Sequence, residues 1–363
     1  MDVLVHVGSN LAINGASRAA FYWAYALRKR GINARLGYCG TWVDRKGFVR
    51  SCGLRIDAEF IDRNLPFRAS DMLIPTEYTA CTSNGYVPDT VELPFDILWN
   101  FDEGVATCSS TNPFKHNGND VLWIQYVHFP GYSIPPNTRI KLFTANSSWT
   151  LKYVYKYWDI SNVIVAQPAI PVDEIEPCSE PPSKRDFDVI VWDRFDASKL
   201  MGADIVIPKL AQKYRVVIMG SATKDMYPIL HTMGAEQVVL NADWDTIRKY
   251  ICSSRVFMSF KVDEHFGIAT AEAVALGVIP LVHASGGKWT DICMEGKVCY
   301  GFRTIIEAYE MAEQLISNAR SGALDDSYYT IRDVARTNLL MMQDASITNL
   351  LAWITKIKGL NST

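Results

Sequence analysis

Short apolar runs bounded by polar turns recur along the chain with the alternation expected of an α/β protein. The first run, from Val3 to Val7, predicts a buried strand, and a turn with Gly8, Asn14 and Gly15 follows it. Apolar residues then recur at helical spacing up to Gly31, which ends the predicted helix. Three later runs, DILWNF, VLWIQYV and IKLFTANS, predict further strands of a parallel sheet, whereas segment 47–90 is predicted to be irregular.

A proline-rich segment divides the chain into two parts. Five prolines stand from Pro168 to Pro182, a composition that disfavours both helix and central strand. We predict that this segment links two domains, residues 1–170 and residues 171–363, as the chain length also suggests. After it we predict strands at 189–192, 216–219, 238–240, 256–260 and 279–283, and helices at 205–213, 245–252, 267–276 and 327–358.

This alternation is typical of a doubly wound parallel sheet. Both halves of the chain are therefore expected to be Rossmann-like domains, with the functional site in a cleft at the carboxyl ends of their strands. The helical tail is expected to pack back on the N-terminal domain.

The composition is that of a folded globular protein and excludes some functions. Hydrophobic residues make up 48% and charged residues 21% of the chain, and the formal net charge of -3 gives no general attraction for nucleic acid. No basic leader precedes the first strand and no window holds about 18 uninterrupted apolar residues, so neither a signal peptide nor a membrane span is expected. Eight cysteines stand singly and are predicted to be reduced in a cytoplasmic protein: Cys39, Cys52, Cys81, Cys108, Cys178, Cys252, Cys293 and Cys299.

The segment DEHFGIATAEAVALGVIPLVHASGG carries the strongest chemical signal. Glu264 and Glu272 are separated by seven residues, and a turn at Gly267 opens the helix that carries Glu272. Glu264 is then expected in the loop after a strand and Glu272 about one and a half turns into the helix, so both carboxylates can point into one cleft. Carboxylates accept hydrogen bonds from sugar and ribose hydroxyls. For an isolated pair, a helix N-terminal acid and a solvated surface residue would be the simpler interpretation.

The glutamate spacing, the intervening FGI and the following HASGG resemble the retaining family 4 glycosyltransferases. This family has the GT-B fold, in which two Rossmann-like domains face a central cleft. The resemblance implies that Glu264 contacts the donor sugar, together with Phe266, Gly267 and Ile268, and that Glu272 holds the nucleotide ribose. It also implies a catalytic role for Glu264.

Two further segments match the family's donor-binding pattern. The resemblance implies that the glycine-rich loop at Gly286 and Gly287 approaches the donor, where glycine N–H groups can cradle phosphate oxygens. Arg194 and Lys199, in WDRFDASK, resemble the family's RxxxxK segment, which binds the donor diphosphate. Two cations there would neutralise the leaving diphosphate, so no metal ion or other cofactor is expected. If each motif stood alone, the glycine pair would be interpreted as an ordinary turn, and Arg194 and Lys199 as solvated surface cations.

Two Asp-x-Asp strings could suggest a metal-binding motif instead. Asp186 and Asp188 come just before a predicted strand, whereas Asp243 stands two residues before Asp245, where a helix N-cap belongs. We interpret both strings as structural.

The N-terminal half carries two weaker candidates. NGASRAA resembles the family's Gly-Gly loop with Asn14 in place of one glycine, and Gly15, at a helix N-terminus, would face the donor phosphate. His128, in QYVHFPG, matches the histidine that many relatives place beside the donor sugar, and is our second catalytic candidate. A core histidine among aromatic residues is the alternative.

The segments YVHFPGYSIP, ANSSWT, EHFGI and HASGG together resemble one branch of the family, the α-1,2-mannosyltransferases that extend lipid-linked oligosaccharides from GDP-mannose. The resemblance implies a lipid-linked or other glycan acceptor and peripheral contact with a cytosolic membrane face. The first helix is the candidate contact, since aromatic and basic residues fall outside its buried face: Arg18, Tyr22, Tyr25, Arg28, Lys29 and Arg30. The alternative is that these residues form the solvated face of an ordinary first helix, with a soluble acceptor.

These observations predict a retaining, metal-independent glycosyltransferase, with mannose from GDP-mannose as the transferred sugar. A UDP-sugar donor, a nucleotide-sugar epimerase and a non-catalytic nucleotide-sugar-binding protein remain alternatives. A dehydrogenase is disfavoured because no GxGxxG follows the first strand.

Overall fold

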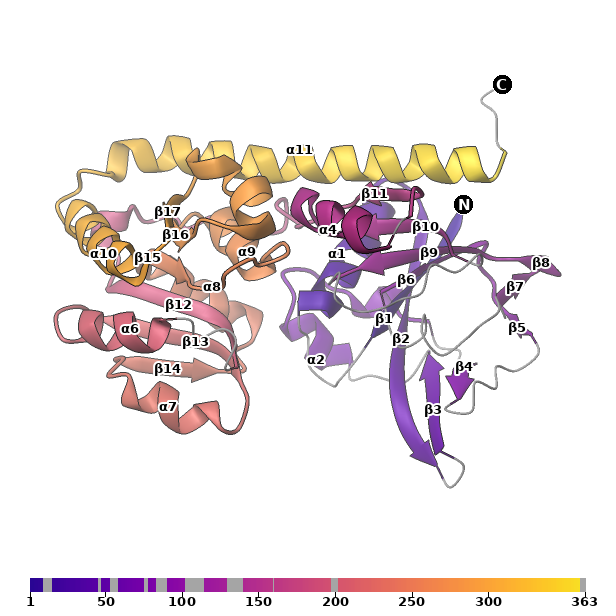
Figure 1. Ribbon diagram of the computed structural model, residues 1–363, viewed down its shortest axis with the longest axis horizontal. Helices are drawn as coiled ribbons and strands as arrows, with labels where there is room; N and C mark the ends of the chain where they lie inside the picture. The colour runs from indigo at the N-terminus through magenta and orange to yellow at the C-terminus, as the bar shows by residue number, and fades with distance from the viewer. Residues whose placement is uncertain are drawn as a thin grey trace. The chain divides into compact units, whose positions relative to one another are not determined.

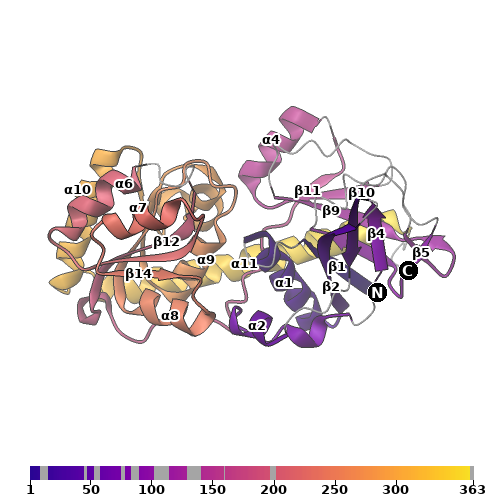
Figure 2. The same ribbon diagram turned by 90° about the horizontal axis from the view of Figure 1, so that it is seen from below.

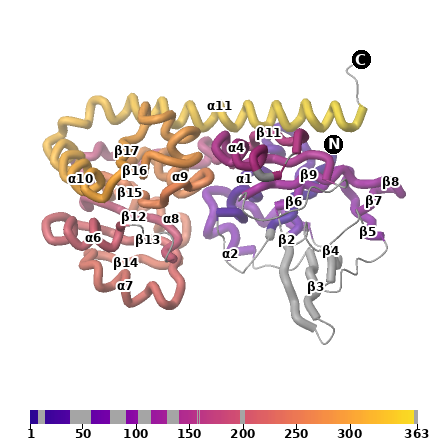
Figure 3. The backbone as a smooth tube through the Cα atoms, viewed as in Figure 1, coloured from indigo at the N-terminus to yellow at the C-terminus, as the bar shows by residue number. Residues whose placement is uncertain are grey.

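The computed structural model describes residues 1–8, 15–44, 47–52, 58–74, 78–82, 90–101, 114–128, 140–158, 160–196 and 202–359. The chain divides into two compact units (Figure 1), the first comprising Met1–Pro171 with Met342–Thr363 and the second Val172–Met341. Helix α11 (Asp325–Ile357) is continuous and contributes residues to both units (Figure 3).

The first unit is built on an eight-stranded sheet with the strand order β11-β10-β9-β6-β1-β2-β3-β4. Strands from β11 to β2 pair in parallel, and β3 and β4 add an antiparallel edge. The strands of this sheet are β1 (Asp2–Gly8), β2 (Asn33–Asp44), β3 (Gly47–Cys52), β4 (Tyr78–Thr82), β6 (Ile97–Asn100), β9 (Leu122–Val127), β10 (Ile140–Ala145) and β11 (Val163–Val165). A smaller sheet contains β5 (Val91–Glu92), β7 (Phe114–His116) and β8 (Asn119–Asp120), and the helices are α1 (Gly15–Lys29), α2 (Ala58–Arg63), η1 (Ser70–Met72) and α4 (Ser148–Trp158).

The apolar runs of the first unit form the strands that were predicted from them. Strands β6, β9 and β10 come from DILWNF, VLWIQYV and IKLFTANS, and every residue of β6 and β9 is buried. The prediction of an irregular segment 47–90 was wrong, because β3, α2 and β4 lie there. Strand β3 pairs antiparallel with β2, and Asp44 lies opposite Gly47. Local composition indicates such strands only weakly, because they depend on pairing with another segment.

Helix α1 is buried on nearly all sides, which corrects the expected exposed face. Tyr22 is fully buried, and Arg18 is 7% exposed and donates to the carbonyl oxygen of Asn64. The rings of Tyr22 and Tyr25 lie against Phe67, at 5.9 Å and 4.3 Å between centroids. The segment that follows α2 therefore covers the side of the helix that was expected to face solvent.

The second unit is a doubly wound sheet in which all strands are parallel, with the order β14-β13-β12-β15-β16-β17. Its path can be followed in Figure 3. The strands are β12 (Phe187–Phe195), β13 (Val216–Ala222), β14 (Gln237–Leu240), β15 (Ser254–Ser259), β16 (Ile279–His283) and β17 (Tyr300–Phe302). The helices are η2 (Pro182–Lys184), α6 (Ala203–Ala211), α7 (Met226–Thr232), α8 (Trp244–Cys252), α9 (Ile268–Leu276), η3 (Lys288–Ile292), η4 (Met294–Gly296) and α10 (Ile305–Arg320), before α11.

Both faces of this sheet are covered, which explains its continuous apolar strands. Helices α6, α7 and α10 lie on one side and α8 on the other (Figure 2). Helices α6, α7 and α10 bury their apolar residues against alternate residues of the sheet, such as Val189, Val191 and Ile218. The sequence pattern missed α7, β17 and α10, although α10 begins with a capping box in which Thr304 and Glu307 bond each other's backbone N–H groups.

Among the described residues, no helix combines the length and the apolar character that a membrane crossing requires.

Candidate functional site

The candidate donor-binding residues lie at one edge of the second unit's sheet. The chain runs from β12 outward to β14 and then returns to β15 on the other side of β12, so the strand order reverses between β12 and β15. Ligands of open α/β sheets bind outside the carboxyl ends of the strands at such a reversal. Arg194 stands near the end of β12, Glu264 follows β15, and the Gly286–Gly287 pair follows β16, the next strand along.

The segment Lys261–Gly267, here called the acidic loop, connects β15 to α9 and carries Glu264. Gly267 has φ 89° and begins the helix from a left-handed conformation that glycine adopts without strain. A Cβ at Gly267 would lie 3.3 Å from Cγ of Glu264. Phe266 is 2% exposed, whereas Glu264 and Ile268 are half-buried. The loop therefore anchors one apolar ring and leaves its carboxylate partly accessible.

The segment Ala284–Lys288, here called the glycine loop, packs directly on the backbone of the acidic loop. Gly286 has φ +74°, and a Cβ there would lie 2.4 Å from the carbonyl oxygen of Glu264. The N–H of Gly287 donates to that same oxygen at 2.7 Å. The N–H of Gly287 is thus bonded to the acidic loop, and the approach of Gly286 and Gly287 to the donor stays a prediction. The glycine pair shapes the backbone around Glu264.

Glu272 lies inside α9 and is fully buried. The alternative of a solvated surface glutamate is therefore wrong. Its helix is apolar on all sides, with every residue from Thr270 to Leu276 buried. Burying a carboxylate costs free energy, so a glutamate inside this otherwise apolar helix marks a candidate functional side chain.

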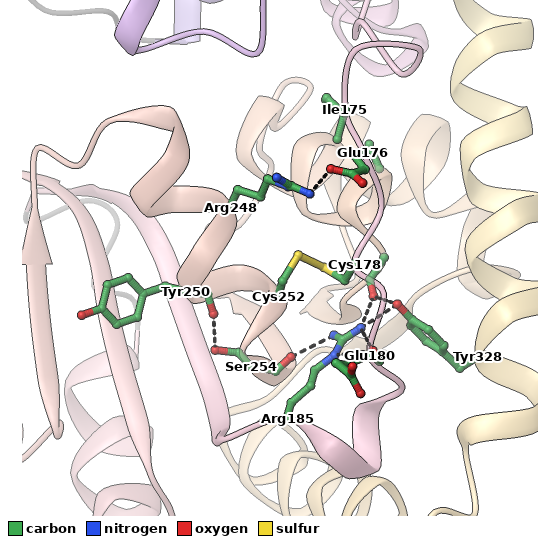
Figure 4. The surroundings of a disulfide bond; sticks show 12 residues. Ile175, Glu176, Cys178, Glu180, Arg185, Arg248, Tyr250, Cys252, Ser254 and Tyr328 are labelled. Carbon is green, nitrogen blue, oxygen red and sulfur yellow. Dashed lines mark hydrogen bonds and ion pairs between the residues drawn. A yellow bond between two sulfur atoms is a disulfide. The ribbon is translucent and has the colours of Figure 1, made fainter.

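The C-terminal end of α9 is held by the first segment of the second unit. Figure 4 shows Cys178 and Arg185 of this segment with their surroundings. The N–H of Cys178 donates to the carbonyl oxygen of Leu276 at 2.8 Å. The buried guanidinium of Arg185 donates to the carbonyl oxygen of Gly277 at 2.9 Å and to the hydroxyl of Tyr328 at 2.6 Å. Burial lowers the pKa of Arg185, and Tyr328 partly offsets this shift. The helix that carries Glu272 is thus anchored at its far end.

The prediction that all cysteines are reduced was wrong. Cys178 is disulfide-bonded to Cys252 at the end of α8, and Cys293 is bonded to Cys299. Cys178 and Cys252 are 74 residues apart in sequence but only 5.2 Å apart between Cα atoms, a proximity that sequence spacing does not reveal. The cysteine argument for a cytoplasmic protein therefore no longer holds.

Of the two cations predicted to bind the donor diphosphate, only Arg194 lies within the described residues. The side chain of Arg194 is 61% exposed and forms an ion pair with Asp196, with 3.0 Å between Nη2 and Oδ2. A phosphate at this position would have to compete with the carboxylate of Asp196. Lys199 lies outside the described residues.

The two Asp-x-Asp strings have structural roles, as predicted. Asp243 caps α8 by accepting from the N–H of Thr246 at 2.9 Å. Asp188 is fully buried and forms ion pairs with Arg255 and Arg320 at 3.2 Å and 2.6 Å. Within the ranges that the structure describes, no group of three or more His, Cys, Asp or Glu side chains is arranged to hold a metal ion.

The first unit has its own strand-order reversal, between β1 and β6, and Gly15 lies beside it. Gly15 is exposed at the start of α1, where an added Cβ would meet no atom within 4 Å, while Asn14 lies outside the described residues. His128 directly follows β9 and is half-buried, with Nε2 3.2 Å from the carbonyl oxygen of Phe101 and its ring 4.9 Å from that of Tyr126. His128 thus stands at the carboxyl end of its strand, packed among aromatic rings.

Three polar residues in and directly before the glycine loop were missed by the sequence analysis. His283 Nδ1 lies 2.8 Å from Oγ of Ser285, and Lys288 is fully buried directly after the glycine pair. Burial and the charge of Lys288 lower the pKa of His283, which keeps its imidazole neutral near pH 7. The HASGGK string contained all three, but nothing in it indicated that Ser285 and Lys288 contact the acidic loop.

The chain shows sequence similarity to known glycosyltransferases over part of its length. No protein-family model matches it. It is 26% identical over 230 residues to the Homo sapiens GDP-Man:Man(3)GlcNAc(2)-PP-Dol alpha-1,2-mannosyltransferase, a match covering 55% of this chain and 45% of that protein. The protein of the same name from Candida glabrata is 24% identical over 192 residues, covering 47% and 36% respectively. The matches thus span less than half the length of these relatives, and they confirm the resemblance predicted from the motifs.

Solved structures match the whole chain. A crystal structure of Anabaena HepE in complex with UDP and glucose aligns with a TM-score of 0.68 at 12% identity, covering 97% of this chain and 100% of that one. A glycosyltransferase from Rickettsia africae aligns with a TM-score of 0.64 at 14% identity, covering 100% and 99%. At these identities the likeness is one of fold, and it confirms that the chain has the GT-B fold.

Proposed function

We propose that this chain is a glycosyltransferase that moves mannose from GDP-mannose to a lipid-linked glycan, with retention of the anomeric configuration and without a metal ion. The observation that carries the proposal is the arrangement at the β12–β15 reversal. There, Glu264 is held in the acidic loop by the glycine loop, and the buried Glu272 lies in the helix that follows. Names of the curated relatives, which specify GDP-Man and a PP-Dol acceptor, support the donor and acceptor.

Each residue has a distinct part in the proposed reaction. Glu264, flanked by Phe266, Gly267 and Ile268, accepts hydrogen bonds from the donor sugar. Glu272, which is fully buried, has to become accessible to accept them from the ribose diol. Arg194 leaves Asp196 to meet the diphosphate, joined by Lys199, while the N-terminal end of α1 at Gly15 also favours negative charge. His128 is assigned to the sugar or acceptor side.

The proposed chemistry is a front-face displacement. The bond from the sugar's C1 to the diphosphate oxygen breaks, and the acceptor hydroxyl forms a new bond to C1 on the same face. The acceptor proton passes to an oxygen of the departing diphosphate, and the two cations stabilise the charge that develops there. This route needs neither a metal ion nor a covalent enzyme intermediate.

A lipid-linked acceptor would bring the chain to a membrane face, and we propose peripheral contact on the cytoplasmic side. Tyr22 is excluded as a contact because it is fully buried, and Arg30 is paired with Asp344. The exposed residues Arg28 and Lys29 remain as candidates on α1. Sedimentation with anionic liposomes at low salt tests the contact, since attraction to anionic lipid weakens as salt rises.

The decisive experiment offers GDP-mannose, UDP-glucose and UDP-N-acetylglucosamine to the full chain, with and without a lipid-linked glycan acceptor. Transfer from GDP-mannose with an α-linked product by NMR is the expected result. Preference for a UDP-sugar would show that the donor is not GDP-mannose. The UDP in the HepE structure favours this alternative. Turnover without acceptor would indicate an epimerase, and tight binding without turnover a non-catalytic protein.

A further inference from the structure

The acidic loop and the glycine loop are joined by three hydrogen bonds that lie close together in both segments. Each involves a different residue of each loop. The contacts are Lys288 Nζ to the carbonyl oxygen of Lys261 at 2.7 Å, Ser285 Oγ with the N–H of Asp263 at 2.8 Å, and Gly287 N–H to the carbonyl oxygen of Glu264 at 2.7 Å. In the bond between Asp263 and Ser285, the backbone N–H of Asp263 donates and the serine Oγ accepts. The bonds thus fall on the backbone of Glu264 and of two residues shortly before it.

Asp263, directly before Glu264, has a backbone conformation that requires support. Its φ is 49°, in the left-handed region that non-glycine residues enter at a cost. The hydroxyl oxygen of Ser285 accepts from the Asp263 N–H and is itself bonded to Nδ1 of His283. One side chain therefore stabilises the turn that sets the direction in which Glu264 leaves the backbone.

Lys288 supports the same loop from within the protein. It is fully buried, and Nζ donates to Oγ of Ser259 at 3.0 Å as well as to the carbonyl oxygen of Lys261. Its Cβ lies 3.1 Å from the position that a Cβ on Gly267 would occupy. The lysine thus reaches the last residue of β15, the first residue of the acidic loop and the residue that begins α9.

We infer that Ser285 and Lys288 are positioning residues that orient the Glu264 carboxylate toward the donor sugar. The inference rests on the proposed function, because it assigns these side chains a purpose in sugar transfer. They act through the backbone of the acidic loop and have no direct part in nucleotide binding. Their loss therefore lowers the rate of transfer and leaves nucleotide affinity unchanged.

The first test compares Ser285→Ala with Ser285→Thr in the full chain. Alanine removes the acceptor for the Asp263 N–H, and we expect kcat for transfer from GDP-mannose to fall roughly tenfold, as for one lost hydrogen bond. Threonine retains the hydroxyl and should restore kcat to within about threefold of the original chain. The dissociation constant for free GDP, measured by calorimetry, should stay within about twofold in both variants. Ser327→Ala, which alters an exposed serine on α11, is the matched control.

The second test uses Lys288→Met with Lys297→Met as the control, since Lys297 is an exposed lysine nearby in sequence. Methionine fills a similar volume but leaves the carbonyl of Lys261 and the hydroxyl of Ser259 without this donor. We expect a fall in kcat of at least about tenfold. Hydrogen exchange provides a readout independent of activity, and it should rise in peptides covering Lys261–Gly267 in Lys288→Met and Ser285→Ala but not in either control.

The inference is overturned if Ser285→Thr is as impaired as Ser285→Ala, if GDP affinity falls as much as kcat, or if exchange in the acidic loop is unchanged. A chain that transfers no sugar from any donor refutes the proposed function instead. In that case the exchange measurements alone decide whether Ser285 and Lys288 hold the acidic loop.

Discussion

The main-chain N–H of Gly287 donates to the carbonyl oxygen of Glu264 at 2.7 Å, so the loop after β16 holds the loop after β15. The two residues are far apart in sequence, and adjacent parallel strands bring them together. Because this contact lies next to the strand-order reversal between β12 and β15, small changes in the glycine loop should alter the candidate site directly.

Gly286→Ala is expected to be strongly destabilising. The new Cβ would lie 2.4 Å from the Glu264 carbonyl oxygen, and the residue would also keep φ +74°. We expect a loss of unfolding free energy above about 2 kcal/mol, together with loss of transfer. Gly234→Ala is the matched control, since its φ is also +74° but its nearest contact is an ordinary 3.6 Å, and about 1 kcal/mol is expected there. Equal losses in urea unfolding would show that the contact with Glu264 is unimportant.

Glu264→Gln and Glu272→Gln should separate the two carboxylates by function. Glu272→Gln should weaken binding of free GDP by roughly 1.5 to 3 kcal/mol, the usual range for a hydrogen bond to a charged group. Glu264→Gln should leave GDP affinity intact and reduce sugar transfer. Calorimetry of GDP binding and initial rates with GDP-mannose measure the two effects. The assignment fails if both variants lose nucleotide affinity equally.

Transfer should survive EDTA. The proposed reaction neutralises the diphosphate with Arg194 and Lys199, so removal of divalent cations should leave the rate unchanged. Initial rates with EDTA, and after adding magnesium or manganese, measure this. Loss with EDTA and recovery with either metal would overturn the proposed role of the two cations.

The Cys178–Cys252 disulfide should stabilise the second unit more than the Cys293–Cys299 disulfide. The first closes a loop between residues 74 apart and the second between residues 6 apart, and longer loops lose more entropy in the unfolded chain. Replacing the first pair with serines should lower the unfolding free energy by about 2 to 4 kcal/mol. Urea unfolding of each double variant measures this. A larger effect of the short loop would contradict the prediction, and peptide mapping without reductant should detect both bonds.

The stability of the protein should fall with pH below about 6.5 partly because of His283. Its pKa is lowered by burial and by the charge of Lys288. The unfolded chain therefore takes up a proton at higher pH than the folded chain does, and protonation favours unfolding as pH falls through the ordinary histidine range. His283→Asn removes this titration, so its Tm should depend less steeply on pH between about 7.5 and 5.5. Parallel Tm profiles for the two proteins would refute the prediction.

Much of the fold was determined by local sequence patterns. Apolar runs predicted the central strands, and Asp243 was placed at the start of α8 because N-capping depends on neighbours only three residues away. The spacing of Glu264 and Glu272 indicated a loop followed by a helix, which β15 and α9 provide. Periodicity and capping are properties of contiguous residues, so the sequence carries them directly.

Only the tertiary structure decided what each candidate residue contacts. Tyr22 and Glu272 were expected to be accessible, yet both are fully buried, because burial depends on what packs over a helix from elsewhere in the chain. The pairing of Cys178 with Cys252, and the contacts of Ser285 and Lys288 with the acidic loop, join segments that are distant in sequence. Such contacts are made by the order of strands in the sheet, which no short stretch of sequence specifies.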